Sequence, residues 1–334
     1  MPMPTVFSTM NIFRRANAVT EYMARNGLRG ERVYAPAGKG ERASPAEMTE
    51  LLIAKAPDME YLIIDTTPVP RAFFARAERL RLIAMYGSGL DHIDIRAATD
   101  HGALVANVPG GNKRSVAELA LCMLLCLSRG IPAAHNDLVA GMWRRRQGRE
   151  LLGQTLGVVG LGAAGTEMAY LGKALGMRVI AYNRTPRPEL ATAIGLEQVS
   201  LDRLLAESDA ISLHIPGNAP LIGETEIARM KHGALLVNLG RGALVDMDAL
   251  ERALAQGRLA GAGLDVFPEE PCDGSHPLFR LPNVVCTPHI GGITQEAGLR
   301  IFRACIDDIL ATMAGQRTPR AVNPEVYDRG GFFT

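Results

Sequence analysis

The chain lacks the features that mark several large classes of protein. Its 334 residues hold 36 Lys and Arg against 35 Asp and Glu, so there is no basic excess of the kind that neutralises a phosphate backbone or an acidic lipid surface. The longest apolar run, Leu119 to Leu127, is far shorter than the roughly 20 residues that span a bilayer, and no apolar signal-peptide core is seen near the first residue. These absences argue against nucleic acid and membranes as partners and predict a cytoplasmic location.

Cysteine is scarce, and its spacing argues against two kinds of structure. The five cysteines are Cys122, Cys126, Cys272, Cys286 and Cys305. None forms a C-x-x-C pair, which disfavours a disulfide framework and a zinc site. Cys122 and Cys126 are four residues apart on a predicted helix, but no His or third Cys accompanies them, so core packing explains them better. We therefore expect no bound metal.

The composition and the pattern of apolar runs indicate two globular α/β domains. Hydrophobic residues make up 47% and charged residues 21%, and the length exceeds the roughly 100–200 residues of one ordinary domain. Short apolar runs alternate with amphipathic segments in two series. The first series is TVFS, RVY, YLIID, LRLIAMYG and ALVANV, and the second is LGVVGLG, MRVIAYN, AISLHIP, ALLVNLG, AGAGLDVF and NVVCTPHI. This alternation predicts two parallel sheets wound with helices.

Two helices are predicted outside these series. In SVAELALCMLLCLSRG, Ser115 and Glu118 have capping-box spacing and Gly130 offers a stop. The middle of this helix is apolar on every face, so we expect it to be buried between domains or between subunits. A second helix is expected over residues 294–314, packed back on the first unit.

The stretch GVVGLGAAG carries a phosphate-binding pattern. Gly160, Gly162 and Gly165 form G-x-G-x-x-G directly after an apolar strand and at the start of a helix. The first glycine permits a tight turn, the second lets a pyrophosphate approach the backbone, and the third lets helix and strand pack closely. Free N–H groups at the helix start complete a dinucleotide site.

The next strand indicates which dinucleotide binds. An NAD-binding unit usually has an acid about 20 residues after the motif, on the ribose hydroxyls, and here the residue is Asn183. Arg184, Thr185 and Arg187 follow it and offer cations and a hydroxyl to a 2′-phosphate. The sequence favours NADP, with NAD as the alternative, because solvated surface arginines also explain this pattern.

Three side chains that can carry chemistry follow strands of the second series. Arg241 follows ALLVNLG, Glu270 follows AGAGLDVF, and His289 follows NVVCTP. Ligands of open α/β sheets bind beyond the carboxyl ends of the strands, so the three side chains can converge if their strands are neighbours. Taken singly, each has a structural explanation as a surface charge, a loop acid or a buried polar group.

Together the three residue types fit reduction of a 2-oxo acid. A guanidinium holds a carboxylate bidentately and polarises a ketone, and an imidazolium protonates the alkoxide that forms. A carboxylate beside the imidazole orients it and raises its pKa. We therefore predict hydride transfer between a nicotinamide and a small 2-oxo or 2-hydroxy acid.

The chain resembles the D-isomer-specific 2-hydroxyacid dehydrogenase family, which includes phosphoglycerate, glyoxylate/hydroxypyruvate and D-lactate dehydrogenases. The motifs that carry the resemblance are YGSGLDHID, NVPGGNKRSVAE, GVVGLGAAG, NLGRGALVD, GLDVFPEEP and PLFRLPNVVCTPHIGG. The resemblance covers nearly the whole chain. It implies D-stereospecificity and a Rossmann-type cofactor domain, residues 107–292, inserted in a flavodoxin-like substrate domain of residues 1–106 and 293–334.

The resemblance also implies residue roles. His289 is the acid/base, Glu270 its partner, Arg241 the substrate-binding cation, and the backbone N–H groups of Ser88 and Gly89 grip the substrate carboxylate. The implied cofactor-binding residues are Gly160, Gly162, Ala163, Ala164, Gly165, Asn183, Arg184, Thr185, His214, Pro216, Leu239, Asp265, His289 and Gly291. Among them Asp265 resembles the residue that holds the nicotinamide carboxamide, and the segment from His214 to Pro216 resembles a turn under the cofactor. A homodimer through the long helix is also implied.

Departures from the family pattern leave alternatives open. Ala163 replaces an arginine common after the second glycine, and Met85 stands where many members have arginine, which disfavours a phosphorylated substrate. Gly217 and Asn218 replace the leucine and threonine usual after the H-x-P turn. One rival reading is a dinucleotide-sensing interaction protein with the same fold, and another is a formate- or phosphite-type dehydrogenase.

Overall fold

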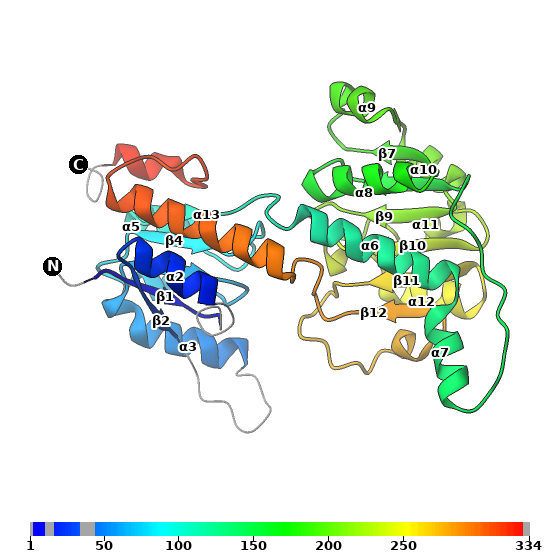
Figure 1. The fold of residues 1–334 in the computed structure, drawn as a ribbon, viewed down its shortest axis with the longest axis horizontal. Helices are drawn as coiled ribbons and strands as arrows, with labels where there is room; N and C mark the ends of the chain where they lie inside the picture. The colour runs from blue at the N-terminus through cyan, green and yellow to red at the C-terminus, as the bar shows by residue number, and fades with distance from the viewer. Residues whose placement is uncertain (1–2, 11–16, 34–43, 330–334) are drawn as a thin grey trace. The chain divides into compact units, whose positions relative to one another are not determined.

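The computed structural model of the protein describes residues 3–10, 17–33 and 44–329. The chain divides into two compact units (Figure 1). Unit 1 is Met1–Gly111 with Gln295–Thr334, and unit 2 is Asn112–Thr294. The sequence suggested divisions after residues 106 and 292, and the units divide after residues 111 and 294.

Unit 1 is a five-stranded parallel sheet with the strand order β2-β1-β3-β4-β5. The strands are β1 (Thr5–Ser8), β2 (Arg29–Arg32), β3 (Tyr61–Ile64), β4 (Leu82–Met85) and β5 (Leu104–Ala106). The α-helices are α2 (Asn17–Arg25), α3 (Pro45–Lys55), α4 (Arg71–Phe74), α5 (Ile95–His101) and α13 (Gln295–Met313), with short 3-10 helices at Ala56–Asp58 and Pro324–Asp328. This strand order is the flavodoxin-like one.

Both faces of the unit 1 sheet are buried. Along β3, Tyr61 and Ile63 pack into the core that contains α2 and α13, whereas Leu62 and Ile64 pack into the core that contains α3, α4 and α5. Figure 1 shows α2 and α13 side by side on one face. A parallel strand covered on both faces has a continuous apolar sequence, which is why the run YLII predicted this strand. The last helix is confirmed, and it packs on unit 1 as expected.

One strand of unit 1 differs from the prediction. The run from Arg32 to Tyr34 was expected to be a strand, and β2 instead covers Arg29–Arg32, with the Val33 N–H still bonded to the Ser8 carbonyl at 2.8 Å. Tyr34 lies outside the described residues. The apolar pattern misled because β2 is an edge strand, and an edge strand tolerates Arg and Glu side chains.

Unit 2 is a seven-stranded parallel sheet with the order β12-β11-β10-β9-β6-β7-β8. The strands are β6 (Thr155–Val159), β7 (Arg178–Tyr182), β8 (Glu197–Gln198), β9 (Ala210–Leu213), β10 (Ala234–Asn238), β11 (Leu259–Leu264) and β12 (Val284–Cys286). The α-helices are α6 (Lys113–Ser128), α7 (Ile131–Val139), α8 (Ala163–Ala174), α9 (Pro188–Ile194), α10 (Leu201–Glu207), α11 (Glu224–Arg229) and α12 (Met247–Ala255). Short 3-10 helices lie at Gly242–Leu244 and Pro277–Arg280.

The strand order of unit 2 is that of a Rossmann fold, with the order reversing between β6 and β9. Helices α6 and α8 pack on one face of the sheet, and α10, α11 and α12 pack on the other. The predicted fold class, two parallel-sheet α/β domains, is confirmed. The sequence missed β8, which is only two residues long and has no apolar run to reveal it.

Helix α6 begins three residues earlier than an N-cap at Ser115 would imply. Its N-cap is Asn112, so the predicted capping box of Ser115 and Glu118 is wrong. The Ser115 hydroxyl instead pairs with that of Thr294 at 2.9 Å, and Glu118 accepts from Arg114 at 2.7 Å. Gly130 does follow the helix end, with a left-handed φ of 59°.

Within the described ranges no single helix is long and apolar enough to cross a bilayer. Helices α6 and α7 meet the length and composition test only as a pair, which is bent by 60°.

Candidate functional site

The glycine motif forms the turn between β6 and α8, at the point where the strand order of unit 2 reverses. Gly160 has a φ of 98°, and Gly165 packs so closely that a Cβ there would lie 1.8 Å from the Gly160 carbonyl oxygen. Both glycines are therefore required by the fold itself. Ala163 and Ala164 form the first turn of α8, where free backbone N–H groups favour an anion.

Gly162 is different, because nothing in the described chain requires it to be glycine. Its φ of −77° and ψ of −167° suit any residue, and no heavy atom lies within 4 Å of where its Cβ would be. The missing side chain leaves open space at the start of α8. This is the cradle that a dinucleotide pyrophosphate needs, so the residues present fit such a cofactor.

The segment after β7 braces the glycine turn. The Leu161 N–H donates to Asn183 Oδ1 at 3.0 Å, and Arg187 Nη1 donates to the Leu161 carbonyl at 2.8 Å. The Asn183 amide also donates to the Thr185 carbonyl at 2.5 Å. Arg184 is exposed beside them. The end of β7 therefore carries an uncharged amide with two arginines nearby.

His214 packs against the glycine turn. A Cβ on Gly160 would meet the His214 carbonyl at 2.9 Å, and one on Gly165 would meet the His214 side chain at 3.3 Å. Its Nε2 pairs with the Ser212 hydroxyl at 2.8 Å, and burial of the ring lowers the pKa of His214 to about 4. The imidazole is neutral at pH 7, and Pro216 follows it at the surface.

The three candidate catalytic residues follow three adjacent strands. Arg241 comes after β10, Glu270 after β11 and His289 after β12, and these strands pair in the order β12-β11-β10. His289 Nδ1 lies 2.6 Å from Glu270 Oε2. The structure thus brings together side chains that are far apart in the sequence, at the carboxyl edge of one sheet.

The hydrogen bond between Glu270 and His289 shifts both pKa values. It raises the pKa of His289 against the opposing effect of burial, and the charge of Asp265 acts in the same direction while Arg241 opposes it. Burial raises the pKa of Glu270, but the bonds from His289 and from the Phe267 N–H outweigh it, so the pKa lies below its usual value. The pair therefore favours imidazolium beside carboxylate.

Gly242, the residue after Arg241, packs closely against the segment that leads to Glu270. A Cβ at Gly242 would lie 1.8 Å from the Phe267 carbonyl carbon, so only glycine fits there. The Phe267 N–H in turn donates to Glu270 Oε1 at 2.8 Å. Arg241 is partly exposed, and its Nη1 donates to the Gly240 carbonyl at 2.9 Å.

Asn238 was missed by the sequence analysis. It is 1% exposed at the end of β10, its amide donates to the Arg241 carbonyl at 2.8 Å, and its Oδ1 accepts from the Gly240 N–H at 3.0 Å. A polar residue that ends an otherwise apolar strand was the available signal.

The remaining candidates divide between the two units. Leu239 (9% exposed) and Asp265 (2% exposed) are buried beside the catalytic strands, and Gly291 follows His289. Ser88 and Gly89 belong to unit 1, in the turn after β4, where the Asn107 amide donates to the Ser88 carbonyl at 2.9 Å. Over the described part of the chain, no three His, Cys, Asp or Glu side chains gather as a metal site.

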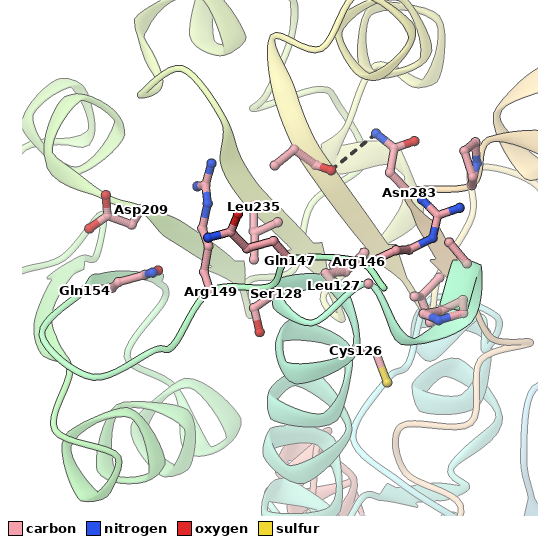
Figure 2. A pocket seen from close by; sticks show the side chains of 16 residues that line it. Cys126, Leu127, Ser128, Arg146, Gln147, Arg149, Gln154, Asp209, Leu235 and Asn283 are labelled. Atoms are coloured by element: carbon pink, nitrogen blue, oxygen red, sulfur yellow. Dashed lines mark hydrogen bonds between the residues drawn. The ribbon is translucent and has the colours of Figure 1, made fainter. Parts of the chain in front are cut away.

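A cavity of about 320 Å³ lies elsewhere in unit 2 (Figure 2). Its lining includes Gln154, Asp209 and Asn283, which stand just before β6, β9 and β12. It therefore lies at the amino ends of the strands, the edge opposite to the catalytic candidates. Arg146, which also lines it, is already paired with Asp137 at 2.7 Å.

Comparison with known proteins identifies the family. Residues 121–291 match the model described as D-isomer specific 2-hydroxyacid dehydrogenase, NAD binding domain. A D-3-phosphoglycerate dehydrogenase of Archaeoglobus fulgidus is 39% identical over 91% of this chain and 56% of its own length. A glyoxylate reductase of Thermococcus litoralis is 40% identical over 83% of this chain and 87% of its own length.

Solved structures agree with the sequence comparison. The D-lactate dehydrogenase of Aquifex aeolicus, solved with NAD and lactic acid, superposes with a TM-score of 0.78 at 29% identity, and the match covers 96% of this chain and 99% of that one. The chain spans little more than half the length of the phosphoglycerate dehydrogenases that it matches. The resemblance seen in the motifs is confirmed: this chain belongs to the D-isomer specific 2-hydroxyacid dehydrogenase family.

Proposed function

We propose that the protein is a nicotinamide-dependent 2-oxoacid reductase, or D-2-hydroxyacid dehydrogenase in the reverse direction. The observation that carries this proposal is the 2.6 Å bond between His289 and Glu270 at the same sheet edge as Arg241. The relatives named glyoxylate reductase and D-3-phosphoglycerate dehydrogenase support it.

The three side chains divide the work of reduction among them. Arg241 binds the substrate carboxylate with its planar fork and polarises the ketone oxygen. His289, whose pKa Glu270 raises in favour of the protonated form, gives its proton to the alkoxide oxygen. The cofactor, when bound, supplies the hydride. Glu270 keeps the imidazole oriented and compensates its charge throughout.

We assign the substrate domain to residues 1–106 and 293–334, and the dinucleotide-binding domain to residues 107–292. In the substrate domain, the backbone N–H groups of Ser88 and Gly89 bind the substrate carboxylate. The support is their position at the carboxyl end of β4, the edge where α/β sheets bind ligands.

We further propose that NADPH is preferred over NADH. Asn183 stands where an acid would bind the ribose hydroxyls, and an acid there would repel a 2′-phosphate. Arg184 and Arg187 supply cations next to it. Bidentate guanidinium contacts are the strong way to hold a phosphate.

Among 2-oxo acids we propose glyoxylate and hydroxypyruvate as substrates. Met85, at the position where many members have arginine, is 5% exposed in the core of unit 1 and offers no cation to a phosphate group. Two relatives named glyoxylate reductase match most of both chains.

A homodimer through α6 and α7 is also proposed. Large apolar side chains are exposed along these helices and the segment that follows them: Leu125 (42%), Ile131 (51%), Leu138 (59%), Val139 (74%) and Trp143 (81%). An apolar surface of this kind marks a protein interface. Leu138→Asp with Trp143→Asp should halve the mass measured by sedimentation, and a wild-type monomer would refute the dimer.

We also propose a cytoplasmic location. All five cysteines are free thiols, which fits a reducing compartment.

A steady-state screen tests the function. Glyoxylate, hydroxypyruvate, pyruvate, 3-phosphohydroxypyruvate and larger 2-oxo acids are each offered with NADPH and with NADH. We expect turnover of the small unphosphorylated acids. Tight cofactor binding without turnover of any of them would instead indicate a dinucleotide sensor, and turnover of formate or phosphite alone would indicate the other dehydrogenase type.

A further inference from the structure

The carboxylate of Asp265 is bound entirely to one short segment, residues 287–291. Thr287 donates its hydroxyl to Oδ1 at 2.5 Å, Ile290 donates its N–H to Oδ1 at 2.8 Å, and Gly291 donates its N–H to Oδ2 at 2.7 Å. The N–H of His289 also donates to the Asp265 carbonyl at 2.9 Å. Asp265 itself is 2% exposed.

This segment leaves the sheet just before His289. The Thr287 N–H makes the last bond along the sheet, to the Leu264 carbonyl at 2.9 Å, and beyond it the chain leaves β12. His289 then adopts a φ of 52°, and among the described non-glycine residues it alone has a positive φ. A β-carbon disfavours that conformation, so surrounding contacts must impose it.

Asp265 supplies those contacts. A carboxylate offers about four lone-pair positions, and three are already used by the 287–291 segment. The Asp265 N–H is anchored in turn to the Asn238 carbonyl at 3.1 Å, at the end of β10. Asp265 therefore connects the sheet to residues on both sides of His289, Thr287 before it and Ile290 after it.

We propose that Asp265 is a positioning residue for His289: its buried carboxylate fixes residues 287–291 so that the imidazole reaches Glu270. The proposal rests on the proposed function only where it uses kinetics. It differs from the role implied by family resemblance, in which Asp265 binds the nicotinamide carboxamide, and the two roles predict different measurements.

The substitution Asp265→Asn distinguishes the positioning role from the carboxamide-binding role. The amide keeps one acceptor but turns a donor toward the Gly291 N–H, so the 287–291 segment should shift and weaken the contact between His289 and Glu270. The charged groups that face His289 are Glu270, Asp265 and Arg241. Losing the Asp265 charge and weakening the Glu270 contact both lower the pKa of His289.

The kinetic test compares wild type with Asp265→Asn. We expect kcat for 2-oxoacid reduction to fall on the order of 100-fold, as for a small displacement of a reacting group. The falling limb of the pH profile should move to lower pH, and the KM for NADPH should stay unchanged. A higher KM for NADPH with an unmoved pH profile would overturn the proposal in favour of the carboxamide role.

Asp209→Asn is the matched control. Asp209 also accepts a backbone N–H, from Thr155 at 2.8 Å, and also carries a second donor, Lys231 at 2.8 Å. Asp209 lies just before β9, at the amino ends of the strands, whereas Asp265 follows β11 at their carboxyl ends. The same substitution there should leave the pH profile in place even if it lowers the melting temperature.

Histidine NMR tests the proposal without any turnover. The His289 ring of the full chain is titrated in wild type, Asp265→Asn, Glu270→Gln and the double variant. If Asp265 acts partly through Glu270, the shift caused by Asp265→Asn should be smaller in the Glu270→Gln background. An unchanged His289 titration in folded Asp265→Asn would refute the proposal, whether or not the protein reduces 2-oxo acids.

A milder variant can be measured in place of Asp265→Asn if that variant does not fold. Thr287→Val removes one of the three donors and keeps the side-chain shape. It should move the His289 titration to lower pH by a smaller amount. An unmoved titration in Thr287→Val, with Asp265→Asn unfolded, would leave Asp265 a residue of the fold alone and would refute the proposal.

Discussion

His289 Nδ1 and Glu270 Oε2 lie 2.6 Å apart, although 19 residues separate them in the chain. The bond joins the segments that leave two neighbouring strands. It also occupies one ring nitrogen, so Nε2 is the nitrogen that can exchange a proton with a substrate.

Replacing Glu270 with Gln tests what this bond does to the proton. Reduction needs imidazolium, so its rate is full below the pKa of His289 and falls above it. Glu270 raises that pKa, so Glu270→Gln should move the falling limb to lower pH. In the oxidation direction neutral imidazole is required, and the rising limb should also move to lower pH. Rates measured where hydride transfer is limiting check this, and unmoved limbs would leave Glu270 a structural acid.

Arg241→Lys keeps the charge but loses the planar fork. Losing a bidentate contact to a charged group costs about 1.5–3 kcal/mol, so kcat/KM for the 2-oxo acid should fall about 10- to 100-fold. Cofactor affinity should barely change. Arg252→Lys is the control, because Arg252 is an exposed partner of Glu224 at 3.5 Å. Near-normal efficiency in Arg241→Lys would show that the guanidinium does not bind substrate.

Asn183→Asp with Arg184→Ala should reverse the preference from NADPH to NADH. Asp keeps the acceptor that the Leu161 N–H uses, so the glycine turn should survive, while the new charge repels a 2′-phosphate. Charge-assisted contacts of this kind are worth about one to two decades of kcat/KM. Arg187→Ala should instead weaken both cofactors, because Arg187 braces the Leu161 carbonyl. A wild type that uses NADH as well as NADPH would contradict the assignment.

Gly162→Ala and Gly165→Ala should fail in different ways. At Gly162 a methyl group meets open space, so Gly162→Ala should keep its melting temperature and lose affinity for the dinucleotide. At Gly165 the methyl group would lie 1.8 Å from the Gly160 carbonyl oxygen, so Gly165→Ala should melt at a lower temperature or not fold. Thermal unfolding and cofactor titration measure the two effects. Equal affinity in Gly162→Ala would argue against a pyrophosphate at that turn.

Much of the fold could be predicted from the sequence, because the buried strands of a parallel sheet appear as short continuous apolar runs. Buried strands such as YLII and ALLVN are apolar on both faces, and glycines occur where turns and close packing need them. The edge strand β2 was predicted with the wrong bounds and the two-residue β8 was missed, since neither needs a continuous apolar run. The capping box failed because a residue pattern cannot tell N-cap from N3: Ser115 is at N3 and bonds Thr294, which lies 179 residues away.

The sequence by itself determined which residue types end the strands: Arg241, Glu270 and His289 are each followed or preceded by recognisable motifs. Only the tertiary structure decided that β10, β11 and β12 are neighbours, and hence that Glu270 meets His289. The hydrogen-bond partners of Asn238 and Asp265 were likewise not predictable from the sequence. Those partners come from other strands and loops, and local sequence does not encode which of them lie within hydrogen-bonding distance.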